Sequence, residues 1–321
     1  MLNLKENALI IVTPIYEDNQ ASSRLFNELS TSNNNFFIVA IDDGSNKNPV
    51  TIDNLKLENI NGILLRLKRN VGHQSAISIG LRYIFPHLSP HHVIVTMDSD
   101  GEDLPSSIST MLKYLESKDV DIVVAQRKKR QETFTFRLFY NSYKVLFKLL
   151  TGRTINFGNF MAIKYFALKR LVVMQELSIH LAGAVLSSKL RVYSCPQDRG
   201  KRYAGTSKMN FIGLLQHGFR ALIIFSEDVL VRVGIVCAAV SALSILASFI
   251  VVALKFVGYG LPGWASIFVG LLVLIFMQTG ALILIMLLLN GIIKNQLLDM
   301  SNTGLDLIEA VETNSATKKY S

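Results

Sequence analysis

The sequence predicts an α/β domain with a mostly parallel sheet, followed by a hairpin of two membrane-spanning helices. Three observations lead to this expectation. Short apolar runs alternate with amphipathic stretches through the first 126 of the 321 residues, two long stretches of the last third carry no charged residue, and the charge is spread very unevenly. Alternation of strand and helix is typical of parallel sheets, and uncharged stretches of about 20 residues match the thickness of a bilayer.

Five short apolar runs have the length and composition of buried strands. They are Leu9–Thr13, Phe36–Ile41, Gly62–Leu67, Val93–Met97 and Asp121–Ala125. Three stretches between them have the periodicity of helices, namely Ala21–Ser30, Gln74–Phe85 and Ser106–Ser117. Ligands of an open parallel sheet bind outside the carboxyl ends of the strands, so the residues that follow these runs are candidates for a site.

The fourth predicted strand ends in a dense acidic segment. Its carboxylates are Asp98, Asp100, Glu102 and Asp103. They repel one another unless a cation lies among them, and hard oxygen ligands suit Mg²⁺ or Mn²⁺ bound together with substrate phosphates. Alternation along an extended chain puts Asp98, Asp100 and Glu102 on one side, so these three are the predicted metal ligands. The alternative is a plain strand-to-helix loop, with Asp103 or Ser106 as helix cap and Pro105 in the first turn.

The other predicted strands also end in polar or charged residues. The segments are Pro14–Asp18, Asp42–Ser45, Lys68–Gly72 and Gln126–Arg127. Loops of both charge signs that converge on one edge of a sheet outline a site for a metal ion and phosphates. A simpler interpretation also exists: Asp43 and Gly44 are common in turns, and Arg69 and Arg127 are equally explained as solvated charges. The six histidines show no metal-ligand spacing and are interpreted as structural or surface residues.

The uncharged stretches Val233–Leu254 and Phe256–Ile293 predict membrane helices at about Val229–Leu254 and Trp264–Leu289. We expect only the short turn Lys255–Gly263 to be exposed on the outer side. The polar start Met1–Asn7 does not resemble a signal peptide, so the domain and both termini are expected in the cytoplasm, although Lys255 mildly opposes the positive-inside rule. The alternative is a buried helical hairpin in a soluble protein.

The net charge of +9 hides a strong asymmetry. Residues 1–126 carry 10 Lys or Arg and 15 Asp or Glu, a net charge of −5, whereas residues 127–220 carry 18 and 3, a net charge of +15. A segment this basic just before membrane helices favours lipid headgroups or an anionic substrate over nucleic acid. Residues 209–228 predict an amphipathic helix at the membrane surface. Cys195 and Cys237 are unsuited to a disulfide, which agrees with a reducing compartment.

Several short motifs occur in an order that resembles a known family. They are TPIYE at 13–17, IDDGS at 41–45, RNVG at 69–72, DSDGEDLP at 98–105 and AGTSK at 204–208. Together they look like family 2 glycosyltransferases of the GT-A fold. The two C-terminal spans resemble the branch of bactoprenol (undecaprenyl-phosphate) glucosyltransferases and dolichyl-phosphate mannose synthases. One departure is Gly158–Met161, where many members of that branch have an Asp-Phe-Arg-like segment, and it leaves the donor sugar open.

The resemblance implies roles for individual residues. Those expected around the nucleotide-sugar are Pro14, Tyr16, Glu17, Asp42, Asp43, Arg69, Asp98 and Ser99. The metal ligands are again Asp98, Asp100 and Glu102, although the relatives often carry Gln in place of Glu102. Those expected at the acceptor phosphate are Arg127, Arg137, Arg199, Arg202, Ser207 and Lys208. The candidates for catalysis are Asp100, Glu102, Asp103 and Arg127.

The expected protein is an inverting, metal-dependent glycosyltransferase that moves a sugar from a UDP- or GDP-linked donor to polyprenyl (undecaprenyl) phosphate. It would act at the cytoplasmic face of the membrane in the synthesis or modification of cell-surface glycans such as lipopolysaccharide. A phosphate acceptor is already anionic near neutral pH and needs no strong general base. If the acceptor is a sugar hydroxyl of a lipid-linked glycan, a carboxylate base is required, and Asp103 is the candidate. A third alternative is a catalytically inactive membrane scaffold.

The predicted organisation has four parts. They are a GT-A domain at 1–208, the amphipathic helix at 209–228, the transmembrane hairpin at 229–293 and a polar tail at 294–321. The sequence leaves open whether the chain forms homo-oligomers.

Overall fold

The computed structural model describes residues 4, 9–32, 35–127, 134–203, 211–258, 263–299, 304–313 and 317–319. The chain divides into two compact units. The first comprises Met1–Phe136, Ile155–Ile224 and Met300–Ser321, and the second comprises Arg137–Thr154 and Phe225–Asp299. This division differs from the predicted boundary at residue 208, because the first unit also takes up the segments before and after the membrane hairpin.

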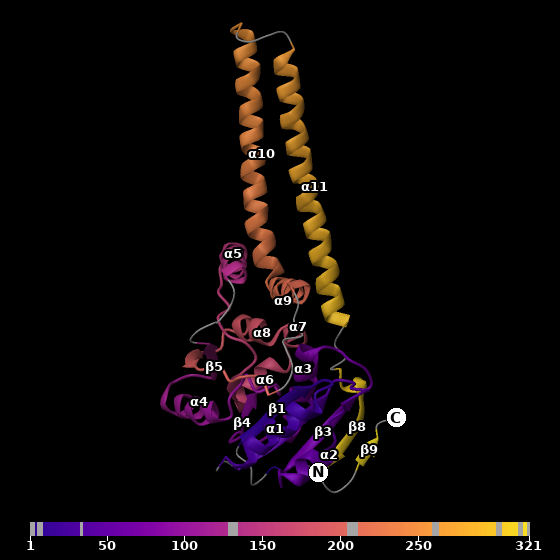
Figure 1. Ribbon diagram of the computed structural model, residues 1–321. Coiled ribbons are helices and arrows are strands. Elements are labelled where there is room, and N and C mark those ends of the chain that lie inside the picture. The colour runs from indigo at the N-terminus through magenta and orange to yellow at the C-terminus, as the bar shows by residue number, and fades with distance from the viewer. Residues whose placement is uncertain are drawn as a thin grey trace. The chain divides into compact units, whose positions relative to one another are not determined.

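The first unit is built on one nine-stranded sheet (Figure 1). Its strands are β1 (Leu9–Ile15), β2 (Phe36–Asp42), β3 (Gly62–Leu67), β4 (Val93–Thr96), β5 (Ile122–Arg127), β6 (Met161–Lys164), β7 (Val192–Gln197), β8 (Ile308–Thr313) and β9 (Thr317–Lys319). They lie in the order β7-β5-β6-β4-β1-β2-β3-β8-β9. The pairs β1–β2, β1–β4, β2–β3 and β5–β7 are parallel, whereas β6 and β8 are antiparallel to their neighbours.

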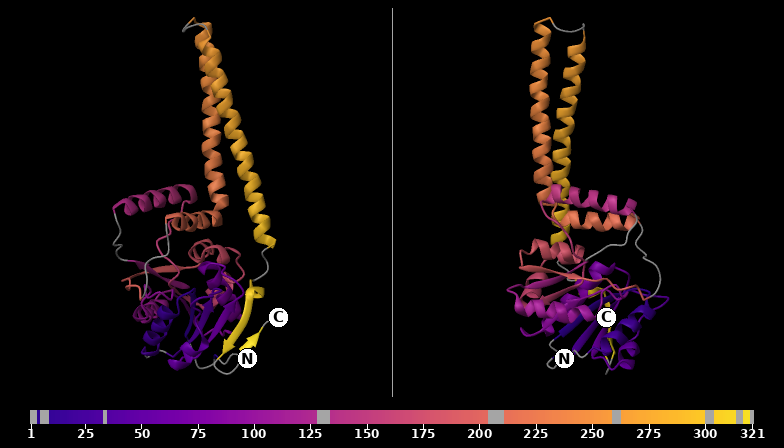
Figure 2. Two further views of the ribbon diagram at one scale, coloured as in Figure 1. Left: turned by 45° about the vertical axis from the view of Figure 1, so that its right-hand side comes forward. Right: turned by 60° about the vertical axis from the view of Figure 1, so that its left-hand side comes forward.

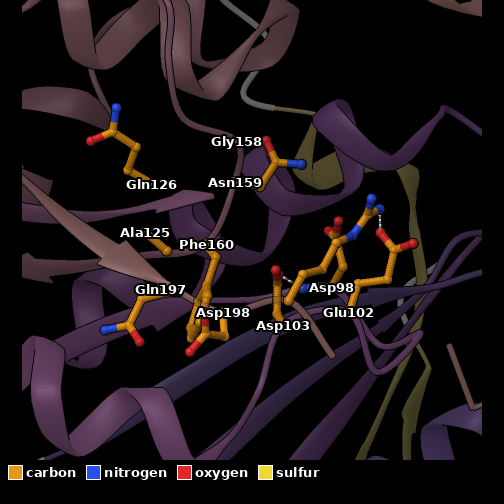
Figure 3. A pocket seen from close by; sticks show the side chains of 11 residues that line it. Asp98, Glu102, Asp103, Ala125, Gln126, Gly158, Asn159, Phe160, Gln197 and Asp198 are labelled. Carbon is orange, nitrogen blue, oxygen red and sulfur yellow. Dashed lines mark hydrogen bonds and ion pairs between the residues drawn. The ribbon is translucent and has the colours of Figure 1, made fainter. Parts of the chain in front are cut away.

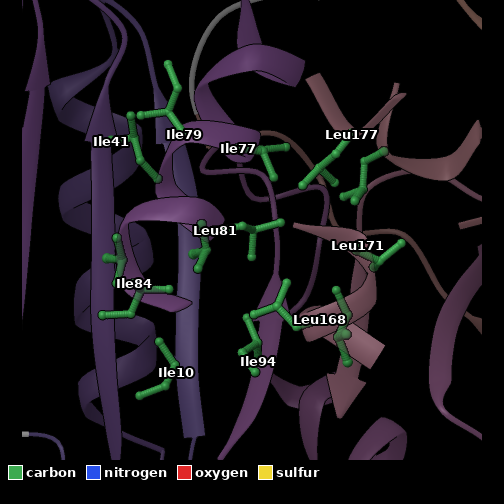
Figure 4. Close-up of a cluster of buried hydrophobic side chains, with 14 of the residues drawn as sticks. Ile10, Ile41, Ile77, Ile79, Leu81, Ile84, Ile94, Leu168, Leu171 and Leu177 are labelled. Carbon is green, nitrogen blue, oxygen red and sulfur yellow. The ribbon is translucent and has the colours of Figure 1, made fainter. Parts of the chain in front are cut away.

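Helices cover both faces of this sheet. One face packs against α1 (Asn19–Ser30), α2 (Ile52–Leu57) and α4 (Ser106–Ser117), and the other packs against α3 (His73–Ile84), α6 (Tyr165–Leu171), α7 (Glu176–Ile179) and α8 (Leu181–Ser187). Figure 4 shows the second core, in which Ile10 and Ile94 of the sheet lie among Ile77 and Leu81 of α3 and Leu168 of α6. Because both faces of the sheet centre are buried, the central strands β1, β2 and β4 are almost entirely apolar, as the sequence suggested.

The first half of the sheet agrees closely with the sequence. All five predicted strands and all three predicted helices are present, and their ends differ by at most three residues. The later strands, β6 to β9, were not predicted. The strand β6 is only four residues long, and its antiparallel insertion between β4 and β5 has no local signal.

The end of the chain corrects the sequence analysis. We expected a polar tail at 294–321, but α11 continues to Asp299 and β8 then pairs with β3, placing Val311 opposite Leu65. Figure 1 shows β8 and β9, in yellow, beside β3. Ile308, Ala310 and Val311 are buried. Pairing with a strand about 250 residues earlier cannot be recognised from so short a segment.

The predicted amphipathic helix at 209–228 corresponds to α9 (Phe211–Ile224) and the first residues of α10. In the part of α9 whose side chains are described, Ala221 is buried, whereas Phe219, Arg220 and Ile223 are exposed. α9 lies against α7 and α8 and belongs to the first unit.

The second unit contains α5 (Phe134–Thr151) and the two long helices α10 (Ser226–Phe256) and α11 (Trp264–Asp299). Both views of Figure 2 show α10 and α11 side by side. Ser241 and Thr279 share a hydrogen bond of 2.7 Å between them. Both helices are long and apolar enough to cross a membrane, and they include the predicted spans, so they are candidate membrane helices.

The pairing of β3 with β8 has a consequence for topology. The two strands lie in one sheet, yet α10 and α11 separate them along the chain. A chain that crosses a membrane twice returns to the side from which it started, so a hairpin of two spans is compatible with this sheet and a single span is not.

This topology, taken together with the cytoplasmic orientation expected from the sequence, predicts the labelling pattern of three single cysteines. They are placed at Asp53, Gly260 and Ser315 in a chain with Cys195 and Cys237 replaced by serine. With a membrane-impermeant maleimide on intact cells, we expect labelling at position 260 and none at positions 53 and 315. All three should react after permeabilisation. Different accessibility of positions 53 and 315 would contradict the two-span hairpin, and labelling at both of these but not at 260 would mean the inverse orientation.

Candidate active site

The candidate site lies at the edge of the sheet where the parallel strands β1 to β4 end. Each of these strands is followed by a loop with acidic or basic residues. Within the first unit, side-chain to backbone hydrogen bonds fix these loops to one another, and each bond below joins two segments that are distant in sequence.

Glu17, after β1, orders the loop after β2. Its carboxylate accepts hydrogen bonds from the backbone N–H groups of Asn46, Lys47 and Asn48 at 2.7–3.1 Å. These bonds hold the pKa of Glu17 below its usual range. The backbone N–H of Glu17 donates to Ser45 Oγ at 2.7 Å. The place of Glu17 beside the nucleotide stays a prediction, and its carboxylate orders the loop after β2.

Asp42, the last residue of β2, is fully buried. Its Oδ1 accepts from the backbone N–H of Ser45 at 3.0 Å, and its Oδ2 pairs with Arg66 Nη1 at 2.7 Å. Burial raises the pKa of Asp42, and the hydrogen bonds from Ser45 and the charge of Arg66 oppose this rise. Arg66 also pairs with Glu312 of β8 at 3.0 Å, a partner that the sequence did not suggest.

Asp43 joins the loop after β2 to the start of α3. Its carboxylate accepts from the backbone N–H of Val71 at 2.7 Å and of Gly72 at 2.9 Å. Burial raises the pKa of Asp43 to about 6 despite these bonds. Gly44 has a φ of +69°, and a Cβ atom there would lie 2.5 Å from the carbonyl carbon of Arg69. The close approach of the two loops thus requires glycine at this position.

The acidic loop after β4 is ordered from within. Asp103 accepts a hydrogen bond from the backbone N–H of Asp98 at 2.9 Å, and Asp100 accepts one from that of Glu102 at 3.0 Å. Ser99 Oγ donates to the carbonyl of Pro14 at 3.1 Å, which ties the loop to β1. Asp103 therefore does not cap α4, whose N-cap residue is Pro105.

Two arginines compensate the charge of this loop. Arg202 donates to Glu102 Oε1 and pairs with Asp100 Oδ2, both at 2.9 Å, and Arg199 pairs with Glu102 Oε2. Backbone N–H groups of Gly200 and Tyr203 donate to the carbonyls of Glu102 and Asp100. The segment that follows β7 is thus bound to the acidic loop along its length. The sequence had named both arginines, but for the acceptor phosphate.

The ring of Tyr203 packs against Gly101 of the acidic loop. Gly101 has a φ of +88°, and a Cβ atom there would lie 2.7 Å from the Tyr203 ring. The hydroxyl of Tyr203 donates to Glu28 at 2.6 Å, and the guanidinium of Arg24 lies 4.6 Å from the ring centroid. Glycine at position 101 permits the close approach of the Tyr203 ring. Glu28 and Arg24 of α1 hold the ring in place.

The predicted metal ligands are not arranged as a metal site. Within the described parts of the chain, no group of three or more His, Cys, Asp or Glu is placed to hold a metal ion. The oxygen donors have the right chemistry for Mg²⁺ or Mn²⁺. However, carboxylate oxygens of Asp100 and Glu102 already have guanidinium partners. The cation that the acidic loop requires is supplied here by arginine, so the residues do not fit a metal ion in this arrangement.

A polar pocket opens beside the acidic loop (Figure 3). It is lined by Asp98, Glu102, Asp103, Ala125, Gln126, Gly158, Asn159, Phe160, Gln197, Asp198 and Arg199. Figure 3 shows the carboxylates of Glu102 and Asp103 on one side and the carboxamides of Gln126 and Gln197 on the other. Such a mixture of hydrogen-bond donors and acceptors suits a polyhydroxylated ligand.

Asn159 and Gln197 were not predicted as site residues. Thr96 Oγ1 donates to the carbonyl of Asn159, and the Asn159 carboxamide contacts His73 Nε2 at 3.0 Å and Gln74 Nε2 at 2.8 Å. The unusual Gly158–Met161 segment was the only signal for Asn159. Nothing in the sequence distinguished Gln197.

The remaining predicted residues are placed as follows. Tyr16 and Arg69 are exposed at the ends of β1 and β3. Arg127 is the last residue of β5 and Arg137 lies in α5 of the second unit, and their side chains are outside the description. Ser207 and Lys208 lie outside the described residues. The structure therefore brings together the donor-side residues, Arg199 and Arg202, but does not place the rest of the predicted acceptor site.

The topology and the acidic carboxyl edge define a GT-A transferase domain. The sequence model of Glycosyl transferase family 2 matches residues 10–177, more than half of the chain, and the protein belongs to this family. It is 26% identical over 243 residues to the uncharacterized glycosyltransferase YkoT of Bacillus subtilis (strain 168), covering 73% of this chain and 69% of YkoT. It is 27% identical over 279 residues to the uncharacterized glycosyltransferase sll0501 of Synechocystis sp., covering 83% and 85%.

Solved structures with a similar fold have low sequence identity. Mannosyl-3-phosphoglycerate synthase from Rubrobacter xylanophilus aligns with a TM-score of 0.49 at 12% identity, covering 69% of this chain and 74% of that one. Glucosyl-3-phosphoglycerate synthase from Mycobacterium tuberculosis, in complex with Mn²⁺, UDP-glucose and phosphoglyceric acid, aligns with a TM-score of 0.49 at 11% identity, covering 70% and 81%.

The raised pKa of Asp43 predicts a pH-dependent stability. The folded protein holds this proton up to about pH 6, whereas the unfolded chain loses it near pH 4. The contribution to stability is therefore complete below about pH 4 and is lost as the pH rises to 6. Between pH 4.5 and 6.5, the free energy of unfolding of wild type should fall by on the order of 2 kcal/mol relative to that of Asp43→Asn. Thermal unfolding at a series of pH values measures this difference. Asp53→Asn, an exposed control, should follow wild type, and parallel curves for Asp43→Asn would contradict the assignment.

The arginine ion pairs predict an unusual effect on metal binding. Without nucleotide, Arg202→Ala should bind Mn²⁺ about five- to tenfold more tightly than wild type, because it releases Asp100 and Glu102. Titration calorimetry of the full chain measures this. Arg191→Ala, which removes a pair with Asp119 and Asp121 elsewhere, should leave Mn²⁺ binding unchanged. Unchanged or weaker binding by Arg202→Ala would show that the arginine does not compete with the metal.

Proposed function

We propose that this family 2 glycosyltransferase transfers a sugar from a nucleotide-sugar to a polyprenyl phosphate, with inversion at the anomeric carbon. The observation that carries the proposal is the combination of a GT-A unit with a hairpin of two apolar helices, preceded by a segment of net charge +15. A polyprenyl phosphate has the matching parts, since its chain is apolar and its headgroup is anionic.

The donor belongs to the loops after β1 to β4. The base and ribose would lie near Tyr16, Asp42 and Asp43, and the diphosphate near Arg69 and Ser99. The sugar would occupy the pocket beside the acidic loop, where Asn159 and Gln197 add polar groups that can bind hydroxyls. UDP and GDP both remain candidates for the nucleotide.

The acceptor phosphate would be bound by basic residues of the middle segment. These are Arg127, Arg137, Arg199, Arg202 and Lys208, and the hydroxyl of Ser207 would be a further hydrogen-bond donor. An oxygen of the phosphate would attack the anomeric carbon, and the bond from this carbon to the nucleoside diphosphate would break. The phosphate is already ionised at neutral pH, so no side chain has to remove a proton. To bind the acceptor phosphate or a donor phosphate, Arg202 must break at least one of its ion pairs with Asp100 and Glu102.

The predicted Mg²⁺ or Mn²⁺ is part of this proposal, with Asp98, Asp100 and Glu102 as its ligands. Its binding requires the arginine ion pairs to open, and the Mn²⁺ titration above tests that requirement. We also propose that the unit faces the cytoplasm, where nucleotide-sugars are made. The labelling experiment above tests this orientation.

A second candidate acceptor is a sugar hydroxyl of a lipid-linked glycan. It is favoured by Asp103, a carboxylate that lines the pocket and is a candidate general base. Asp103 also accepts a hydrogen bond from Asp98, so its replacement would disturb the loop as well as remove a base. The nature of the product distinguishes the two acceptors better than mutation of this residue does.

Transfer by the purified full chain in lipid nanodiscs tests the proposal. A panel of nucleotide-sugars is offered with undecaprenyl phosphate, and mass spectrometry identifies the lipid product. We expect one donor to give a glycosyl-phosphoryl lipid. Asp100→Asn should lower kcat at least about a hundredfold, because it removes a carboxylate that is a proposed metal ligand, while the exposed control Asp53→Asn retains full activity.

The outcomes separate the alternatives. Sugar on a lipid-linked glycan, with none on undecaprenyl phosphate, would favour the hydroxyl acceptor. A chain that binds no nucleotide-sugar in calorimetry and transfers none would be a scaffold. Full activity of Asp100→Asn would remove the acidic loop from the mechanism.

A further inference from the structure

The strand that follows the membrane hairpin reaches the donor-side loops through one side chain. β8 pairs antiparallel with β3, and the register places Glu312 opposite Leu64 and Ala310 opposite Arg66. The carboxylate of Glu312 extends along this edge to Arg66. Arg66 Nη2 and Nε both donate to Glu312 Oε1, at 3.0 and 3.2 Å.

Arg66 holds two carboxylates at once. On its other side, Nη1 pairs with Asp42 Oδ2 at 2.7 Å, and Nη2 lies 3.4 Å from the carbonyl of Val50. The Asp42 side chain is fully buried, whereas those of Arg66 and Glu312 are 24% and 17% exposed. Because Nε, Nη1 and Nη2 of Arg66 all donate hydrogen bonds, its guanidinium has little freedom to rotate. The orientation in which Arg66 contacts Asp42 therefore depends on its contact with Glu312.

Asp42 in turn orders the loop after β2. Its Oδ1 accepts from the backbone N–H of Ser45, and Ser45 Oγ accepts from the backbone N–H of Glu17. Glu17 then binds the backbone of the next three residues of the same loop. A connected series of polar contacts therefore runs from β8 to the loops after β1 and β2, two of the four loops that would hold the donor.

We propose that Glu312 is a positioning residue for donor binding, which acts through Arg66 on Asp42 and the loop after β2. This inference rests on the proposed donor site. It assigns a functional role to the strand after the second candidate span, which the sequence analysis had interpreted as a tail. Glu312 contacts neither substrate, so its effect is on the affinity for the nucleotide and not on the chemical step.

A purely structural role would have a different signature. The pair of Arg66 and Glu312 is largely buried, but Glu312→Gln keeps a carboxamide oxygen that can accept a hydrogen bond from Arg66, which limits the loss of stability. Loss of Glu312 should therefore change the melting temperature only slightly, while it frees the Arg66 side chain and weakens nucleotide binding. Glu309 is a matched control, because it is an exposed glutamate of the same strand. It takes no part in the contacts described above for the site.

The test compares Glu312→Gln with Glu309→Gln in the full chain. For Glu312→Gln we expect the Kd for the nucleoside diphosphate to rise three- to tenfold. The ligand titrated is UDP or GDP, whichever the preferred donor contains, and the donor KM should rise by a similar factor. The kcat, the acceptor KM and the melting temperature should stay close to wild type. Glu312→Asp, which keeps the charge on a shorter side chain, should be intermediate, and Glu309→Gln should match wild type in every measurement.

A double-mutant cycle with Arg66→Met makes the test specific. Since Glu312 acts through Arg66, Glu312→Gln should add nothing to the Kd of Arg66→Met. An equal loss of affinity in both backgrounds would overturn the inference, as would a wild-type Kd for Glu312→Gln or a loss explained by unfolding. If wild type binds no nucleotide at all, the proposed function fails together with this inference, whereas a normal Kd for wild type and Glu312→Gln refutes the inference alone.

Discussion

The arrangement of the site depends on the need to compensate the negative charge at the end of β4. Asp98, Asp100, Glu102 and Asp103 follow one buried strand and cannot all remain ionised without positive charge close to them. Arg199 and Arg202 supply it, and this requirement brings the segment after β7 to the acidic loop, about 100 residues away in sequence. These ion pairs thereby help to organise the carboxyl edge of the sheet.

The same arginines have two possible sets of partners, and this links charge compensation to function. Under the proposed function, phosphates or a divalent cation would compete with these ion pairs, so binding at the acidic loop would involve an exchange of partners. Opening these pairs has an energetic cost, because Arg202, Asp100 and Glu102 are each less than a third exposed. A donor that brings its own cation could meet that cost.

The loops on the donor side share another physical device. Glu17, Asp43 and Asp103 each use a carboxylate to bind backbone N–H groups of another segment or of their own loop. A carboxylate can accept several such bonds, so it can shape an irregular loop that has no regular backbone pairing. Acidic residues in this edge therefore have two tasks: some build the loops, and others remain available for ligands. Sequence motifs alone do not separate these tasks.

Features that depend on local sequence could be predicted, whereas contacts between residues distant in sequence could not. Local periodicity identified the strands from Leu9 to Ala125, the helices between them and both candidate membrane helices, because burial in a sheet or a bilayer imposes a composition on each segment by itself. The motifs at strand ends likewise indicated the family and the edge of the sheet where the site lies. Side-chain partners were a different matter, since Arg202 with Asp100, Arg66 with Glu312, and Glu17 with the loop after β2 join residues between 28 and 246 positions apart. The sequence by itself determined which elements form and where the charged groups gather, whereas only the tertiary structure decided which charges meet, because ion pairing depends on distances that the sheet order creates.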